Sequence, residues 1–215
     1  MKVLIACEES QEVCKAFRKL GHEAYSCDIL PCSGGHPEWH IQDDIRNVLR
    51  HEVIGCSGLP EWDLIIAHPI CTYLTNSGVC WLYNKDKSKN LDRWDKMKEG
   101  ARFFKFFTML KTPMVAIENP IMHKYAVDII GRRQDQLIQP WQFGHGETKA
   151  TCLWLKGLPK LEPTNIVEGR EQRIHNMVDE NGKKIAWNNP KIKYLRSKTF
   201  KGIAKAMAEQ WGKFL

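Results

Sequence analysis

Thiol and carboxyl side chains follow short apolar runs at four places in the sequence. These places are residues 7–10, Asp28, residues 68–71 and residues 118–120. A thiolate is a strong nucleophile. A carboxyl group can carry a proton during catalysis, and burial in a crevice raises its pKa toward the range that suits this task. A lone cysteine after a strand is more often a packing residue, so the chemistry depends on whether the fold brings these groups together.

The elements that must position these residues alternate between apolar runs and amphipathic stretches. Apolar runs predict strands over residues 2–6, 23–29, 63–67 and 114–117. Apolar side chains at three- and four-residue spacings predict helices over residues 11–20, 91–111 and 200–214. Such alternation is typical of a mostly parallel α/β sheet. Because ligands bind beyond the carboxyl ends of the strands in these sheets, we expect Asp28, Cys71 and Glu118 to face one crevice.

The second half of the chain is less regular. Residues 135–143 and 151–155 have the pattern of two strands joined by a turn at residues 144–147. Residues 157–190 are rich in proline, glycine, asparagine and charge, which predicts a small irregular insertion. A chain of 215 residues is long enough for one substantial core and short for two. We therefore expect residues 1–215 to form a single domain.

The composition is that of an ordinary globular protein. Hydrophobic residues make up 43% of the chain and charged residues 27%. No apolar run approaches the roughly 18 residues needed to span a bilayer, and the first residues lack the pattern of a secretory signal. We expect a cytoplasmic protein without a membrane partner, whose eight cysteines are reduced.

Basic residues concentrate near the end of the chain. The net charge is +7, and no acidic residue lies between Glu180 and Glu209. Trp187 and Tyr194 are interleaved with the lysines of this stretch, which would allow stacking beside phosphate contacts. The predicted nucleic-acid contacts are Lys183, Lys184, Lys191, Lys193 and Arg196, with Lys149 upstream. The alternative is a solvated basic face.

Three segments carry a family resemblance. Asp63-Leu64-Ile65-Ile66-Ala67-His68-Pro69-Ile70-Cys71 resembles the strand and Pro-Cys loop of cytosine-5 DNA methyltransferases. Ile117-Glu118-Asn119-Pro120 resembles the Glu-Asn-Val segment of that family, and residues 197–204 with the helix after them resemble its last motif. The whole sequence is similar to short phage and prophage proteins described as cytosine methyltransferase-like. The motifs follow the family's order and cover most of the chain outside about residues 157–190.

The resemblance implies a Rossmann-like, S-adenosylmethionine-dependent methyltransferase fold, in which residues 197–215 close back onto the N-terminal part. It also implies an enzyme that methylates cytosine in DNA, in the host cytoplasm if the protein is phage-encoded. Cys71 is then the nucleophile that adds to carbon-6 of the base. Glu118 then holds or donates the proton at ring nitrogen 3, with Asn119 beside it. The base must leave the helix stack to be reached.

The resemblance further implies a site for the methyl donor. Asp28, at the end of the second strand, is expected to contact the ribose hydroxyls. The other expected donor contacts are Cys7, Glu8, Glu9, Ser10, Asp44, His68 and Pro69. The loop of residues 7–11 contains no glycine, whereas the family has a glycine-rich loop that approaches the methionine part of the donor. Ile70 replaces the proline that precedes the family's cysteine.

Two other functions remain open on the sequence. The missing glycines and Ile70 favour a methyltransferase-fold protein that binds nucleic acid or a nucleotide without transferring a methyl group. An amino-group methyltransferase is the other alternative, although the loop of residues 68–71 lacks the aromatic side chain that would stack on the base. Cys27, Cys32, His36 and His40 have a spacing that could bind zinc, but it is not a standard one, so no metal is expected. His145 between two glycines is interpreted as a turn residue rather than a base.

Overall fold

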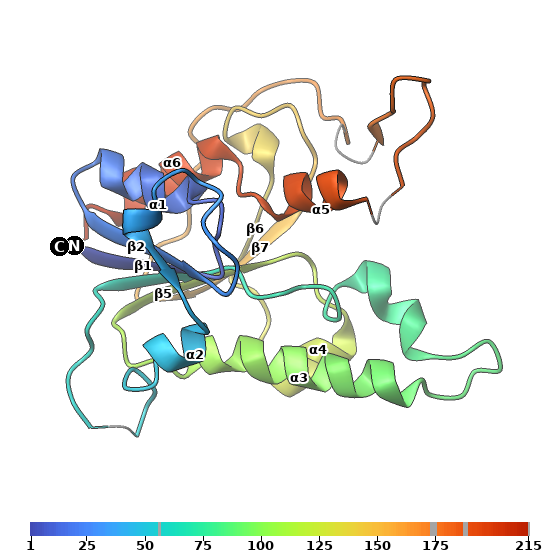
Figure 1. The fold of residues 1–215 in the computed structure, drawn as a ribbon, viewed down its shortest axis with the longest axis horizontal. Helices are drawn as coiled ribbons and strands as arrows, with labels where there is room; N and C mark the ends of the chain where they lie inside the picture. Colours follow the sequence, from blue (N-terminus) through green and yellow to red (C-terminus); the bar gives the residue numbers. More distant parts are fainter. Residues whose placement is uncertain (56, 173–175, 187–188, 215) are drawn as a thin grey trace.

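The computed structural model describes residues 1–55, 57–172, 176–186 and 189–214 (Figure 1). In this part of the chain one sheet of seven strands has the order β3-β2-β1-β4-β5-β7-β6. Pairing is parallel from β3 to β5, whereas β7 is antiparallel to both of its neighbours. The bounds are β1 Lys2–Ala6, β2 Glu23–Asp28, β3 His40–Gln42, β4 Leu64–Ala67, β5 Met114–Asn119, β6 Gln136–Ile138 and β7 Thr151–Lys156. The predicted Rossmann-like, mostly parallel α/β fold is confirmed.

Helices cover both faces of the sheet (Figure 1). On one face α1 (Glu12–Lys19) packs against α6 (Lys201–Trp211), and on the other α3 (Leu91–Thr108) packs against α4 (Lys124–Ile130) near α2 (Ile45–Val48). The short helix α5 (Pro190–Ser197) precedes α6. Three 3-10 helices complete the described elements: η1 Pro37–Trp39, η2 Asn76–Leu82 and η3 Pro140–Gln142. No helix in the described ranges has the length and apolar character needed to cross a membrane.

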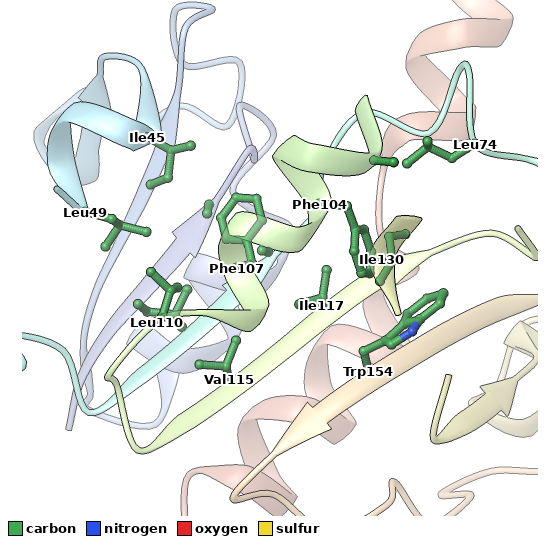
Figure 2. Packing of buried hydrophobic residues seen from close by; sticks show 14 of the residues in the cluster. Ile45, Leu49, Leu74, Phe104, Phe107, Leu110, Val115, Ile117, Ile130 and Trp154 are labelled. Atoms are coloured by element: carbon green, nitrogen blue, oxygen red, sulfur yellow. The ribbon is translucent and has the colours of Figure 1, made fainter. Parts of the chain in front are cut away.

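The core has two parts, one on each face of the sheet. Because side chains alternate along a strand, Ile65 and Ala67 of β4 face α3, whereas Leu64 and Ile66 face α1 and α6. Figure 2 shows the α3 side, where Phe104 and Phe107 pack against β5 and β7. Strands buried on both faces need near-continuous apolar runs. Such runs can be recognised in the amino-acid sequence, so these strands could be predicted from it.

Several predicted elements require correction. The expected strand over residues 135–143 ends at Ile138, because Pro140 has no backbone N–H and begins the 3-10 helix η3. The helix predicted over residues 91–111 ends at Thr108, and its first residue, Leu91, is exposed although it is apolar. The sequence-based prediction missed β3, α2, α4 and α5, each at most eight residues long. Elements this short carry too few periodic positions to be distinguished from loops.

Candidate active site

The register of the sheet aligns four of the predicted site positions along one edge. Ala6 is paired with Cys27 of β2 and Ala67 of β4, and Ala67 is paired with Ile117 of β5. The residues that directly follow these paired positions are Cys7, Asp28, His68 and Glu118. They therefore lie together at the carboxyl edge of neighbouring strands. The strand order reverses between β1 and β4, which is where ligands bind in open α/β sheets.

His68 and Glu118 form a buried pair at this edge. The alternation that turns Ile66 and Ala116 toward α1 and α6 also places His68 and Glu118 on that side of the sheet. His68 Nδ1 lies 2.9 Å from Glu118 Oε2, and their side chains are only 12% and 13% exposed. Thr199, just before α6, donates a longer hydrogen bond of 3.4 Å to the same oxygen.

The ionisation of this pair differs from the sequence expectation. Burial alone would raise the pKa of Glu118, but the hydrogen bond and charge of His68 outweigh burial, with help from Lys149 and Thr199, and lower this pKa to about 2. Burial opposes the charged form of His68, yet the Glu118 hydrogen bond and charge raise its pKa above the ordinary value. The expectation of a raised Glu118 pKa was wrong, because it omitted the histidine that follows the neighbouring strand.

Cys71 lies in the loop that follows His68. Asn119 at the end of β5 holds this loop, since its side-chain amide donates a 2.9 Å hydrogen bond to the Pro69 carbonyl. Asn119 is 1% exposed, and its Oδ1 has no hydrogen-bond partner among the described residues. Burial raises the pKa of the Cys71 thiol, while the charges of Lys149 and Arg196 oppose that rise. The free protein therefore holds Cys71 as a thiol beside two cationic side chains.

The loop between β1 and α1 uses an internal carboxylate. Glu8 is 5% exposed and accepts hydrogen bonds from the backbone amides of Val13 (2.7 Å) and Cys14 (3.2 Å) in the first turn of α1. These amides would otherwise be available to an anionic ligand. Cys7 (φ 60°) and Gln11 (φ 58°) adopt left-handed backbone conformations without being glycine. The loop thus keeps a backbone shape that favours glycine while Glu8 caps the helix.

A second segment packs over this loop. Gln11 is fully buried and hydrogen bonds to Ser26 and His36. Ser33 donates a backbone hydrogen bond to the Glu9 carbonyl, and its hydroxyl also bonds the Glu9 carboxylate. A Cβ at Gly34 would lie 2.5 Å from Gln11 Cβ. The segment between β2 and β3 therefore covers the loop that was expected to approach the methyl donor, with the Ser10 carbonyl beneath Gly34.

The acidic residues predicted for donor binding differ in their availability. Asp28 Oδ1 accepts the Leu30 amide at 2.9 Å, and no partner of Oδ2 occurs among the described residues. Asp44 caps α2 and pairs with Arg46 at 2.5 Å, and the Arg46 hydrogen bond lowers the pKa of Asp44. Asp28 fits the two hydroxyls of a ribose. The loop of residues 7–11 does not fit the carboxylate of a methionine moiety, because Glu8 already holds the helix amides.

The predicted nucleic-acid contacts occupy different environments. Lys149 Nζ donates to the backbone carbonyls of Arg196 (2.7 Å) and Lys198 (3.5 Å) and acts electrostatically on Cys71 and Glu118, so it belongs to the candidate active site. Lys183 and Lys184 are exposed. The side chains of Lys191 and Lys193, and all of Trp187, lie outside the described residues. Tyr194 is 39% exposed, with Lys198 Nζ 4.2 Å from its ring centroid.

The zinc-like pattern and His145 make other contacts. His40 lies against Ser26 and the Leu30 carbonyl, whereas the Cys27 and Cys32 thiols donate to Asp43 O and Gln11 Oε1. No group of three or more potential metal ligands occurs in the part of the chain that is described. His145 Nε2 accepts the Gly202 amide at 2.9 Å and so anchors the start of α6.

The sequence did not indicate the contacts that four side chains make at this site. His68 and Glu8 are predicted as donor contacts and Lys149 as a nucleic-acid contact, and Thr199 is given no role of its own. Only His68 had a usable signal, since parallel strands of matched register place the residue after β4 next to the residue after Ile117. Lys149 and Thr199 come from irregular segments, whose positions no periodicity indicates.

Comparison with known proteins gives structural likeness only. No protein-family model and no curated protein matches the sequence. A solved structure described as a DNA modification methyltransferase encoded within an E. coli prophage aligns with 77% of this chain and 51% of its own, at TM-score 0.46 and 13% identity. The Entamoeba histolytica methyltransferase EhMeth aligns with 83% of this chain and 60% of its own, at TM-score 0.44 and 14% identity. The aligned part thus spans little more than half the length of these neighbours.

Proposed function

We propose that this chain is a DNA cytosine-5 methyltransferase-like enzyme in which Cys71 adds covalently to the base. The observation that carries the proposal is the convergence of the Cys71 loop with the His68–Glu118 pair at the carboxyl edge of β4 and β5, where Asn119 ties the loop to the pair. A nucleophile and a proton-handling group on adjacent strand ends are the two functions that addition to a pyrimidine requires.

The proposed addition balances without an external reagent. The Cys71 sulfur bonds to carbon-6, the ring double bond shifts to carbons 4 and 5, and ring nitrogen 3 gains the proton that the thiol loses. Glu118, which is ionised in the free protein, is the proposed relay: it takes this proton from the thiol and passes it to ring nitrogen 3. Lys149 and Arg196 favour the thiolate form of Cys71, since their charges oppose the effect of burial. The product is an enamine that is nucleophilic at carbon-5.

S-adenosylmethionine is the proposed methyl donor, and Asp28 is the proposed contact for its ribose. When bound, the donor would supply an electrophilic methyl group at carbon-5. Isothermal titration should detect S-adenosylmethionine binding that Asp28→Ala weakens at least tenfold, while DNA affinity is unchanged. Equal donor affinity in the two proteins would exclude this role of Asp28.

A donor-independent test addresses the covalent step directly. Addition at carbon-6 makes the hydrogen on carbon-5 exchangeable, so wild type should release tritium from DNA that contains [5-³H]cytosine. Cys71→Ser should abolish release, and Glu118→Gln should slow it by about 10²–10⁴, with unchanged circular dichroism. Cys80→Ser is the matched control, because Cys80 is an exposed thiol outside the pair. Release that survives Cys71→Ser would refute the assignment.

A second function is favoured by the β1–α1 loop. Glu8 on the amides of α1 and the segment packed over Gln11 suit a methyltransferase-fold protein that binds nucleic acid without transferring a methyl group. The donor titration and the tritium-release assay described above distinguish the two functions. DNA binding without tritium release and without donor binding would establish the binding protein.

A further inference from the structure

His68 contacts one buried carboxyl group and is influenced electrostatically by a second one that follows a different strand. Its Nδ1 contacts Glu118 at the end of β5, at 2.9 Å. Glu8, which follows the neighbouring strand β1, interacts electrostatically with the same imidazole. The His68 backbone amide also donates to the Ala6 carbonyl of β1, at 2.9 Å. This histidine therefore joins the loop that caps α1 to the carboxylate beside Cys71.

The second ring nitrogen of His68 is also buried. His68 Nε2 has no hydrogen-bond partner among the described residues. A buried polar atom without a partner costs free energy unless its environment compensates. Burial and the charge of Lys149 oppose a protonated imidazole here, whereas the Glu118 hydrogen bond and the charges of Glu118 and Glu8 favour it and raise the pKa of His68.

We propose that His68 is the positioning residue of the candidate active site, and that its imidazolium fixes the ionised form of Glu118 while it electrostatically couples Glu118 to Glu8 in the β1–α1 loop. This inference deepens the function proposed above. A single proton on the His68 ring then acts to lower the pKa of both Glu118, in β5, and Glu8, after β1. Removal of that proton, or of either carboxylate, changes the electrostatic balance at the other end.

The charges around the three groups support this arrangement. Burial raises the pKa of Glu8, and His68 together with the amides of Val13 and Cys14 opposes that rise. Glu118 faces His68, Lys149 and Thr199. The pKa of Glu8 stays above its ordinary value, and the charge of His68 is the largest effect that opposes this rise. Two buried carboxylates without a nearby cation would not both ionise.

Histidine side-chain NMR tests the coupling without DNA or donor. With ¹⁵N- and ¹³C-labelled histidine, the His68 ring should stay doubly protonated above pH 6.5 in wild type. Glu118→Gln should lower its titration midpoint strongly, and Glu8→Gln should lower it by a smaller but measurable shift. Glu38→Gln is the matched control: Glu38 forms an exposed pair with His36 at 3.0 Å, so this change should leave the His68 midpoint in place.

Two results would overturn the inference. A neutral His68 ring at pH 6.5 in wild type would remove the shared cation, and a His68 midpoint that is unchanged in Glu8→Gln would remove the coupling. If Glu8→Gln does not fold, Glu8→Asp replaces it: this change keeps the acid but shortens its side chain, so the His68 midpoint should still shift, and an unchanged midpoint would remove the coupling. The tritium assay adds a functional readout, because His68→Gln should move the acidic limb of the pH–rate profile to higher pH. An unmoved limb in an active His68→Gln protein would contradict the role, whereas failure of the methyltransferase proposal leaves the NMR result standing.

Discussion

At the scale of single residues, the reactivity of Cys71 depends on opposing effects. Burial raises the pKa of its thiol, whereas Lys149 and Arg196 favour the thiolate. Lys149 is held in place by the carbonyls of Arg196 and Lys198 near the end of α5. The ionisation of Cys71, in the loop after β4, thus depends on Lys149, which precedes β7.

Alkylation kinetics should reveal this dependence. The rate of Cys71 modification by iodoacetamide should rise with pH to a midpoint above the ordinary thiol value of 9.0, because only the thiolate reacts. Lys149→Met should move the midpoint still higher, since it removes a favourable charge. Mass spectrometry of the Cys71 peptide gives the rates. Lys205→Met, on the exposed side of α6, is the control and should leave the midpoint in place.

At the scale of elements, the start of α6 is closely fitted to the site. A Cβ at Gly202 would lie only 1.8 Å from the Phe143 carbonyl oxygen and 3.0 Å from His145 Nε2. This close approach fixes Thr199, three residues earlier, against Glu118. A small residue at position 202 is therefore required by backbone packing.

Substitution of this glycine should separate packing from helix propensity. Gly202→Ala should lower the free energy of unfolding by about 1–3 kcal/mol, because the backbone must move to relieve the clash. Gly100→Ala in α3 is the control: its Cβ would meet Leu74 at an ordinary 3.5 Å, so stability should rise by about 0.5–1 kcal/mol. Urea unfolding measures both. Equal effects of the two substitutions would show that α6 does not dock at Gly202.

At the scale of the whole molecule, the buried pair links stability to pH. The pKa of Glu118 is lowered from 4.5 to about 2. Its contribution is therefore fully present above about pH 4.5 and is lost as the pH falls through about 2. The raised pKa of His68 acts in the opposite direction, since its contribution is present below the ordinary value of 6.5 and is lost as the pH rises through the higher folded value.

His68→Gln should remove most of the acid dependence. At pH 6 this change should lower the free energy of unfolding by about 3–5 kcal/mol, because it leaves a buried carboxylate without its partner. The decrease in stability between pH 4.5 and 2 should then be smaller than in wild type. The double substitution His68→Gln/Glu118→Gln should be less destabilising than the sum of the single ones. Additive single effects in urea unfolding would contradict the pairing.

The basic charge of the chain makes a further prediction about DNA. Lys183 and Lys184 are exposed residues of the irregular segment that precedes α5. If they bind phosphates, Lys183→Glu/Lys184→Glu should reduce the salt slope of log affinity by roughly 0.7–0.9 for each phosphate that is no longer neutralised. Lys19→Glu/Lys213→Glu changes the net charge equally at exposed positions, at the end of α1 and just after α6, and is the matched control. The same slope in both double variants would show that this charge is a solvated face.

The central sheet and its carboxyl edge could be predicted from the amino-acid sequence. Strands such as residues 2–6 and 64–67 are buried on both faces, so they require uninterrupted apolar runs that can be recognised directly. Cys71 and Glu118 could be placed at one edge for the same reason. Glycine at position 131 and proline at position 140 carried local signals for element ends, but the short elements beside them had too few residues to show a period.

The chemistry of that edge required the three-dimensional arrangement. Whether Glu118 is neutral or ionised depends on His68, fifty positions away, and on Lys149 and Thr199, which come from segments without periodicity. Whether the loop of residues 7–11 is open depends on Glu8 capping α1 and on Gly34 packing against Gln11. A pKa and the accessibility of a loop are set by the groups within a few ångströms, and sequence patterns identify strands and helices without specifying those neighbours.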